Sequence, residues 1–281
     1  MISDAVTGLP VSDLSVIAVA DGHLAFRDVG DGPAVVLLHA GFVDHRMWDE
    51  QVAFLSERFR VIAADARGHG GSANASRPFR QCDDVADLLR ALGLGPVVLV
   101  GVSMGGAIAV ETAVEHPDLV RALVVSGAGI SEPGRVDRWS AAVTEEQGRA
   151  LAAGDTQGWV HAWLKGVAGP ERTLDDVDPD IVRRIGEMIA HTASKHTVDE
   201  PDRTTRVAIT PERAAAIQVP VLAVHGGIDA ETHIAAGELL VSTVTDGRST
   251  TIDGVGHYPN LERPDEFNAI LEEFLAALPR Q

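Results

Sequence analysis

Ser103 lies between Gly101 and Gly105 in the order G-x-S-x-G, a pattern in which a serine hydroxyl can act as a nucleophile. Residues 97–100 are apolar and largely β-branched, which is typical of a buried strand, and residues 105–114 are alanine-rich, which is typical of a buried helix. An abrupt turn from strand to helix needs small residues two positions before and after it, because larger side chains would collide. The alternative is that Ser103 simply begins a helix, a position that serine favours.

Two residues far along the chain could complete the chemistry. A serine hydroxyl is a weak nucleophile at neutral pH, so it needs a base and a third group that orients the base. Asp229 lies in a glycine-rich loop after the apolar run 219–225, and His257 lies in another such loop after the run 248–252. Asp229 could instead be a helix N-cap, and His257 an ordinary solvated or buried histidine. Because all three follow different strands in the order expected of a triad, the sequence predicts a catalytic triad.

The negative oxygen of a tetrahedral intermediate needs hydrogen-bond donors. The backbone N–H of Met104, directly after Ser103, is the first predicted donor. The second is expected from the loop after the apolar run 34–39, with Gly41 as the better candidate and Phe42 next. Without Ser103, this loop would be interpreted as an ordinary turn between a strand and a helix.

The elements that must position these residues alternate along most of the chain, which predicts an α/β fold with a mostly parallel sheet. Residues 15–29 predict a β-hairpin. Further strands are predicted at 34–39, 60–64, 97–100, 122–126, 219–225 and 248–252. Helices are predicted at 46–57, 80–92, 105–116, 231–243 and 264–277.

Residues 131–215 interrupt this alternation with amphipathic helical pieces, and they are too numerous for a plain loop. We expect a helical cap over the edge of the sheet where the strands end, since open α/β sheets bind ligands there. The predicted domains are therefore a core of residues 1–130 and 216–281, and a cap of residues 131–215.

The cap is expected to shape a substrate pocket. Four large side chains are the candidates for its lining: Trp139, Trp159, Trp163 and Met188. Each tryptophan has an equally simple alternative role, which is to pack the cap onto the core. The cap also holds His161, His191 and His196, but their spacing does not match a helical metal-binding pair, and we predict no metal.

With these motifs in place, the chain resembles the α/β-hydrolase superfamily. The resemblance rests on five motifs in order: His39–Phe42, DARGHGGS at 65–72, GVSMGG at 101–106, HGGIDA at 225–230 and GVGHYP at 254–259. It implies an eight-stranded, mostly parallel sheet with helices on both faces and a helical cap inserted after the sixth strand. Ala40 departs from the common His-Gly-x order.

The resemblance also bears on the nucleophile and on the acid. Dehalogenases and epoxide hydrolases of this superfamily use an aspartate at the elbow, so Ser103 argues against both activities. Some members take the acid from after the sixth strand, where Glu132 is the nearest carboxylate and is the alternative to Asp229. The 65–72 motif is mainly structural in the family, so His69 is not the expected base.

The net charge disfavours some classes of binding partner, and the cysteine count excludes an intrachain disulfide. The 281 residues include 41 acidic and 23 basic side chains, and the formal net charge of −18 disfavours binding to nucleic acid or to an anionic membrane. Cys82 is the only cysteine, so an intrachain disulfide is excluded. The N-terminal residues do not resemble a signal peptide, and we expect a cytoplasmic protein. The sequence leaves a monomer and a homodimer open.

Together these features predict a serine hydrolase that needs no cofactor. Its expected substrate is a small or medium, largely apolar carboxylic ester or lactone, cleaved through an acyl-enzyme intermediate. Three alternatives keep the same pocket: a hydrolase of C–C bonds, a haloperoxidase-like or perhydrolase enzyme, and a small-molecule receptor with a vestigial hydrolase site.

Overall fold

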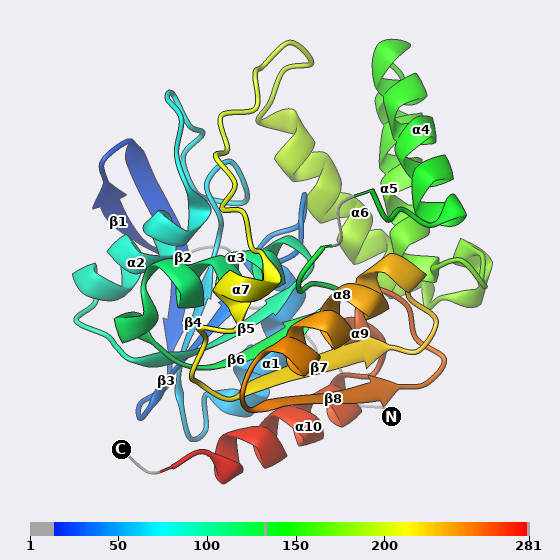
Figure 1. Cartoon of the computed structure of the whole chain (residues 1–281). Coiled ribbons are helices and arrows are strands. Elements are labelled where there is room, and N and C mark those ends of the chain that lie inside the picture. The colour runs from blue at the N-terminus through cyan, green and yellow to red at the C-terminus, as the bar shows by residue number, and fades with distance from the viewer. Residues whose placement is uncertain (1–13, 132–133, 280–281) are drawn as a thin grey trace, which may run out of the picture.

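A computed structural model describes residues 14–131 and 134–279 of the chain. Its strands are β1 (Ser15–Val19), β2 (Gly22–Val29), β3 (Ala34–Leu38), β4 (Arg60–Ala64), β5 (Val97–Val102), β6 (Val120–Ser126), β7 (Val221–Gly226) and β8 (Gly247–Ile252). Within the described residues they form one eight-stranded sheet in the order β1-β2-β4-β3-β5-β6-β7-β8. Figure 1 shows this twisted sheet at the centre of the molecule.

The sheet is mostly parallel, which confirms the fold class predicted from the alternating pattern. Strands β1 and β2 form the predicted antiparallel hairpin, and β2 runs antiparallel to β4. The other neighbours, from β4 through β8, are parallel. Strand β5 continues two residues beyond its predicted end, because Gly101 still pairs with Leu38 of β3 and with Val125 of β6.

The five helices predicted outside residues 131–215 are present with small differences at their ends, and a short helix over residues 259–262 was not predicted. The α-helices are α1 (Asp49–Leu55), α2 (Gln81–Ala91), α3 (Met104–Glu115), α4 (Arg138–Ala152), α5 (Thr156–Ala168), α6 (Pro179–Ser194), α7 (Pro211–Ala214), α8 (Glu231–Thr243), α9 (Pro259–Glu262) and α10 (Pro264–Ala277). In the part of the chain that the structure describes, three 3₁₀ turns lie between them: η2 (His45–Trp48), η3 (Pro117–Leu119) and η4 (Leu174–Asp176). The helix expected at 46–57 is thus a 3₁₀ turn followed by α1.

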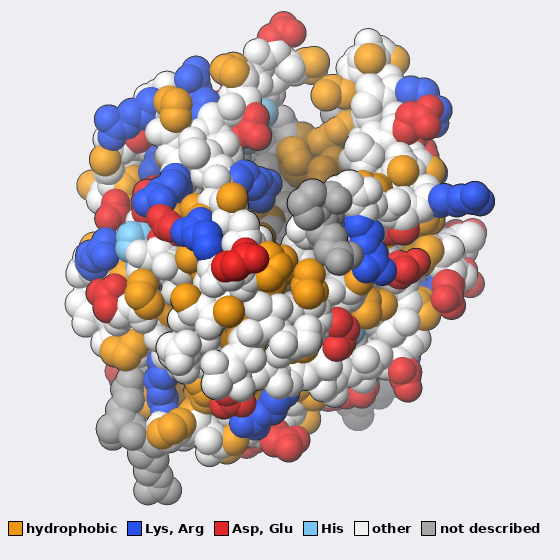
Figure 2. All heavy atoms as spheres, in the orientation of Figure 1, with side chains coloured by type: hydrophobic (Ala, Val, Ile, Leu, Met, Phe, Trp, Pro, Cys, Tyr) orange, Lys and Arg blue, Asp and Glu red, His pale blue; other side chains and the backbone are white. Residues whose placement is uncertain are grey.

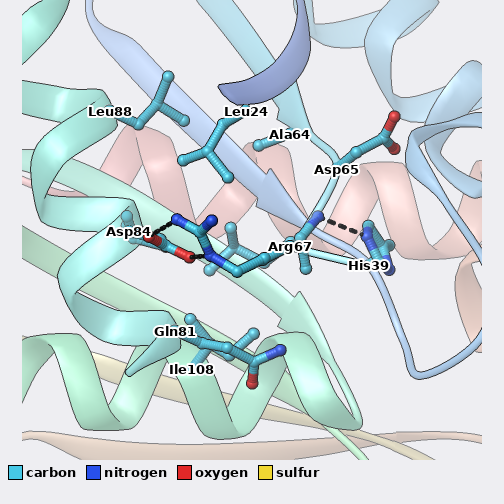
Figure 3. Close-up of a pocket in the computed structure, with 12 residues that line it drawn as sticks. Leu24, His39, Ala64, Asp65, Arg67, Gln81, Asp84, Leu88 and Ile108 are labelled. Carbon is cyan, nitrogen blue, oxygen red and sulfur yellow. Dashed lines mark hydrogen bonds and ion pairs between the residues drawn. The ribbon is translucent and has the colours of Figure 1, made fainter. Parts of the chain in front are cut away.

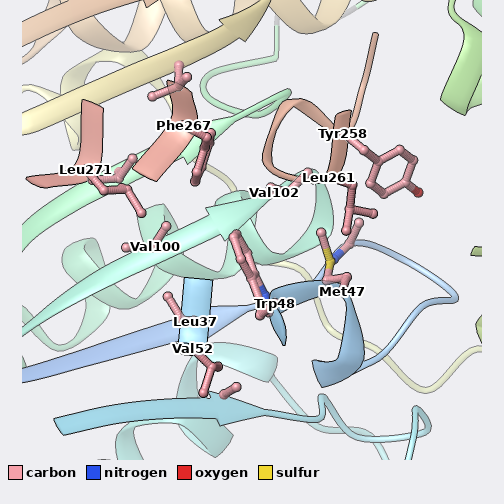
Figure 4. Close-up of a cluster of buried hydrophobic side chains, with 14 of the residues drawn as sticks. Leu37, Met47, Trp48, Val52, Val100, Val102, Tyr258, Leu261, Phe267 and Leu271 are labelled. Carbon is pink, nitrogen blue, oxygen red and sulfur yellow. The ribbon is translucent and has the colours of Figure 1, made fainter. Parts of the chain in front are cut away.

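Helices cover both faces of the sheet. Along β3, Val35 and Leu37 pack into the core cluster shared with α1 and α10, whereas Val36 and Leu38 pack into a second cluster shared with α2, α3 and α8. Figure 4 shows Trp48, Phe267 and Leu271 around Val100 in the first cluster. Strands buried on both faces have nearly continuous apolar sequences, as the central strands β3, β5, β6 and β7 do.

The segment of residues 131–215, which we call the inserted segment, follows β6 and precedes β7. Its helices α4, α5 and α6 stand together at one side of the molecule, beyond the sheet (Figure 1). Helix α4 has no buried residue, whereas the apolar face of α6 buries Ile185 and Met188 in the core. That these residues act as a cap stays a prediction.

Candidate active site

Ser103 lies at a sharp turn between β5 and α3. Its backbone dihedral angles are φ 53° and ψ −116°, in a region that residues other than glycine rarely adopt. Its N–H donates to the Ser126 carbonyl of β6 at 2.7 Å, and α3 begins at the next residue, Met104. Strain of this kind is characteristic of functional sites, and it presents the hydroxyl at the ends of the strands.

The glycines on either side of Ser103 are required by close backbone contacts. A Cβ atom on Gly105 would lie 2.0 Å from the carbonyl oxygen of Leu38, and one on Gly101 would lie 2.3 Å from the backbone of Gly105. Neither contact can be relieved by moving a flexible side chain, because the opposing atoms belong to the backbone. The turn that holds Ser103 therefore requires glycine at positions 101 and 105.

Asp229 and His257 meet beside this turn. Asp229 follows β7 and His257 follows β8, and His257 Nδ1 lies 2.8 Å from Asp229 Oδ2. Asp229 is 6% exposed and also accepts a hydrogen bond from the Ala230 N–H at 2.7 Å. Burial alone would raise the pKa of Asp229, but the charges and hydrogen bonds of the neighbouring imidazoles lower it well below its usual range. Glu132, the alternative acid, lies outside the described residues.

Two further residues touch this pair and were not predicted from the sequence. His233 Nδ1 lies 3.0 Å from Asp229 Oδ1, and its ring packs on that of His257 with centroids 4.4 Å apart. A Cβ atom on Gly127, where φ is +58°, would lie 2.5 Å from His257 Cε1. His233 follows Asp229 by four residues and lies in the first turn of the predicted helix 231–243, so the sequence could have indicated this contact, whereas the contact with Gly127 arises only in the folded chain.

Ser103, Asp229 and His257 all line one cavity of about 1200 Å³. Figure 2 shows the hollow on the surface, with hydrophobic side chains inside it. Within the described residues no hydrogen bond joins the Ser103 hydroxyl to His257. Such contacts are often long before a substrate binds, so the shared cavity and the Asp229–His257 bond are the informative geometry.

Aromatic side chains form part of the cavity wall. Trp139, Trp159 and Trp163 all line it, and the Phe42 ring packs against those of Trp159 and Trp163 with centroids 4.8 and 4.7 Å apart. Met188 is placed differently, since it is 2% exposed and packs in the core cluster rather than among the residues that line the cavity.

Backbone N–H groups in the loop after β3 and at the start of α3 lack a protein acceptor among the described residues. Within the described residues these belong to Gly41, Phe42 and Met104, and all three residues line the cavity. Phe42 has φ 60°, in the left-handed region, and the Cβ position of Gly41 lies 4.0 Å from that of Met104. The loop after β3 and the start of α3 thus approach each other where donors for an oxyanion are needed.

The 65–72 loop supports the cavity from one side. Burial lowers the pKa of His69 to about 3, so this imidazole is neutral at pH 7 and its Nδ1 donates to the Arg67 carbonyl at 3.0 Å. Figure 3 shows a second, small cavity beside Arg67, which pairs with Asp84 at 2.7 Å. With about 20 Å³ it has room for a single water and not for a substrate.

Polar contacts tie the inserted segment to the loops of the site. Lys195 Nζ donates to three carbonyl oxygens of the 65–72 loop at 2.5–3.1 Å. Arg172 pairs with Glu262 at 2.8 Å, and Glu262 accepts from the N–H of Gly256, the residue before His257, at 2.8 Å. The position of the histidine loop therefore depends on the inserted segment as well as on the sheet.

Three groups of described residues place metal-ligating atoms within 4.8 Å of one another. They are Cys82–Asp83–His116, Asp229–His233–His257 and Asp44–His45–Asp65. In each group the nearest atoms are already joined by hydrogen bonds, for example His45 Nδ1 to Asp65 Oδ1 at 2.9 Å. The expectation that the protein needs no metal stays a prediction. Among the described helices, none is long and apolar enough to cross a membrane.

Comparisons with known proteins identify the family. Residues 33–264 match the sequence profile of the alpha/beta hydrolase fold. The chain is 26% identical over 251 residues to 3-oxoadipate enol-lactonase 1 of Acinetobacter baylyi, covering 88% of this chain and 90% of the relative. It is also 26% identical over 261 residues to the carboxylesterase YbfK of Bacillus subtilis, covering 90% and 83%. A solved hydrolase from Pseudomonas aeruginosa superposes with a TM-score of 0.78 at 27% identity, covering 95% of this chain and 100% of that one. The chain therefore belongs to the α/β-hydrolase family.

Proposed function

We propose that the protein is a serine hydrolase that cleaves a small or medium, largely apolar carboxylic ester or lactone. The observation that carries the proposal is the buried hydrogen bond of 2.8 Å between Asp229 and His257. Both residues line the same cavity as Ser103, whose backbone is strained. A carboxylate held on Nδ1 leaves Nε2 of the ring free to accept a proton, as a base for serine requires.

The reaction would proceed in two steps. In the first, Ser103 Oγ attacks the carbonyl carbon, its proton passes to His257 Nε2, and the tetrahedral intermediate expels the alcohol, which takes that proton. In the second, water attacks the acyl-enzyme while His257 again takes the proton, and the carboxylic acid leaves as Ser103 recovers its hydrogen. With a lactone, the alcohol stays attached to the acyl group. Asp229 orients the ring and stabilises its protonated form.

The proposed oxyanion hole consists of the Met104 N–H together with the N–H groups of Gly41 and Phe42. These donors are free of protein acceptors within the described residues, as donors awaiting a developing charge must be. The positive φ of Phe42 supports the assignment of this loop to the site, because residues with strained backbone conformations lower stability and cluster at functional sites.

The apolar character of the proposed substrate rests on the aromatic wall. We propose that residues 131–215 act as a cap, with Trp139, Trp159 and Trp163 on the side of the cavity that faces the substrate. Two relatives of 26% identity, an enol-lactonase and a carboxylesterase, support the proposal that the substrate is a lactone or an ester. A cavity of about 1200 Å³ has room for more than a short acyl group.

Replacing Ser103 by alanine tests the proposal, with p-nitrophenyl esters of increasing chain length as substrates. We expect turnover to fall by a factor on the order of 10⁴ or more, with little change in melting temperature. Ser131→Ala is the matched control, because Ser131 lines the same cavity and has no assigned role. A fluorophosphonate should label the wild type and the control but not Ser103→Ala.

The same preparation separates the alternatives. Hydrolysis of a dienone in preference to any ester would indicate a C–C hydrolase, and oxidation dependent on peroxide would indicate a perhydrolase. Turnover that persists in Ser103→Ala would show that the nucleophile is wrongly assigned.

A further inference from the structure

We propose that His233 is a positioning residue that shares the Asp229 carboxylate with His257 and thereby extends the activity to lower pH. The inference rests on the proposed triad and adds a fourth member to it. Asp229 uses one oxygen for each imidazole: Oδ2 lies 2.8 Å from His257 Nδ1, and Oδ1 lies 3.0 Å from His233 Nδ1.

The two rings also contact each other directly. Their centroids are 4.4 Å apart and their planes are inclined by 33°, so the rings contact each other in a tilted arrangement. His233 lies in the first turn of α8 and lines the cavity with Ser103 and His257. Its side chain is 36% exposed, whereas that of Asp229 is 4% exposed. A proton on His233 would therefore sit close to the base, with access to solvent.

Charges on every side of His233 bear on whether its ring is protonated. Asp229 holds its Nδ1, and Asp137, the N-cap of α4, is held next to α8 by a hydrogen bond of 2.7 Å from the Thr232 hydroxyl. Both carboxylates favour the cationic ring. Protonated His257 and the N-terminal end of the α8 dipole oppose it. The more distant Arg135 and Glu231 pair with each other at 3.1 Å, so their charges largely cancel.

The balance of these effects favours the cation. Burial lowers the pKa of His233, but the hydrogen bond and charge of Asp229 and the charge of Asp137 outweigh it and raise the pKa above the usual 6.5. A cation beside His257 opposes protonation of that second ring, because like charges repel. A positive charge on His233 therefore acts against proton transfer to His257, and removing His233 should remove that opposition.

Two substitutions separate the charge of His233 from its hydrogen bond. Glutamine at 233 can still donate to Asp229 but carries no charge, whereas alanine removes both. We expect the acid limb of the pH profile of kcat/KM to move to higher pH by roughly one unit in His233→Gln and in His233→Ala. The alanine variant should lose more of the plateau kcat, because it also leaves Asp229 less well held. His161→Gln, which changes an exposed histidine that is not among the residues lining the cavity, should leave the acid limb in place.

A second readout does not require activity. In the full chain labelled with ¹⁵N-histidine, the signals missing from the His233→Gln spectrum identify His233. We expect this ring to titrate above pH 6.5 in the wild type and at lower pH in Asp229→Asn, because the substitution removes the carboxylate charge.

The outcomes distinguish a failure of the proposed role of His233 from a failure of the proposed hydrolase function. An acid limb that stays in place in both His233 variants, with only a uniform loss of kcat, would overturn charge sharing and leave His233 a purely structural contact. A ring that titrates below pH 6.5 in the wild type, or that ignores Asp229→Asn, would overturn it as well. If the wild type hydrolyses no ester and no fluorophosphonate labels Ser103, the proposed function fails. The titration of ¹⁵N-labelled histidine would still show whether the Asp229 carboxylate favours the protonated form of His233.

Discussion

The turn around Ser103 and helix α4 both border the cavity, yet they are built in opposite ways. At the turn, added carbons on Gly101 and Gly105 would lie 2.3 and 2.0 Å from backbone atoms. Along α4 no residue is buried, and an added carbon on Gly148 would find nothing within 4 Å. The region proposed to do the chemistry has no spare volume, whereas the region proposed to receive the substrate has a great deal.

This difference indicates which parts of the molecule can tolerate amino-acid substitutions. Backbone packed on both sides holds the serine in a strained conformation, because the surrounding sheet leaves it no alternative. A helix with an exposed face can change its side chains at little cost in stability, and so can alter the shape of the cavity. The proposed chemistry and the proposed specificity are thus separated in the structure.

The sharpest test of this contrast places the same methyl group in both regions. Gly105→Ala should lower the free energy of unfolding by at least about 3 kcal/mol, or prevent folding, because the opposing Leu38 carbonyl cannot move aside. Gly148→Ala should raise it by about 0.5–1 kcal/mol, because alanine is the better helix former. Chemical denaturation measures both, and a Gly105→Ala protein as stable as the wild type would remove the basis of the comparison.

A smaller effect is expected when the aromatic wall is changed. Trp159→Ala should lower kcat/KM about 10-fold for an ester of a medium-length acid and much less for an acetate ester, because only the longer chain reaches the lost ring. Trp159→Phe keeps an aromatic ring against Phe42 and should retain most of the activity on both. An equal loss on all chain lengths would mean that the tryptophan packs the inserted segment onto the core and does not contact substrate.

The smallest effect on stability is expected where the beginning of α4 contacts α8. Asp137 caps α4 by accepting from the Ser140 N–H at 2.8 Å, and it also accepts from Thr232 of α8. Burial would raise the pKa of Asp137, but these hydrogen bonds lower it to about 2. Because the folded-state pKa is depressed, the stabilisation is fully present above about pH 4 and is lost as pH falls towards 2.

Asp137→Ala should therefore lower the free energy of unfolding by about 1 kcal/mol at pH 6, with a difference from the wild type that shrinks below pH 4. Asp155→Ala is the matched control, because Asp155 caps α5 in the same way and, among the described residues, has no hydrogen bond to α8. Denaturation curves at pH 3, 4 and 6 would contradict the expectation if the Asp137→Ala difference were independent of pH.

How much of the site was predictable depended on whether the constraint was local. Gly101, Ser103 and Gly105 form a motif that a strand-to-helix turn imposes within five residues, so their place at this turn could be inferred before the fold was known. Met188 could not be placed in the same way. Its helix is amphipathic, but the sequence does not say that its apolar face packs on the core and not on the cavity.

The α/β fold class, the order of the strands along the chain and the residue types proposed for the triad follow from the amino-acid sequence, because apolar periodicity and glycine spacing are local properties. The contacts among Gly127, Asp229 and His257, and the shared use of the Asp229 carboxylate by His233, are visible only in the folded chain, where these residues come together after β6, β7 and β8. Those contacts join residues from different loops, and only the packing of parallel strands into one sheet sets the distances between the loops that follow them.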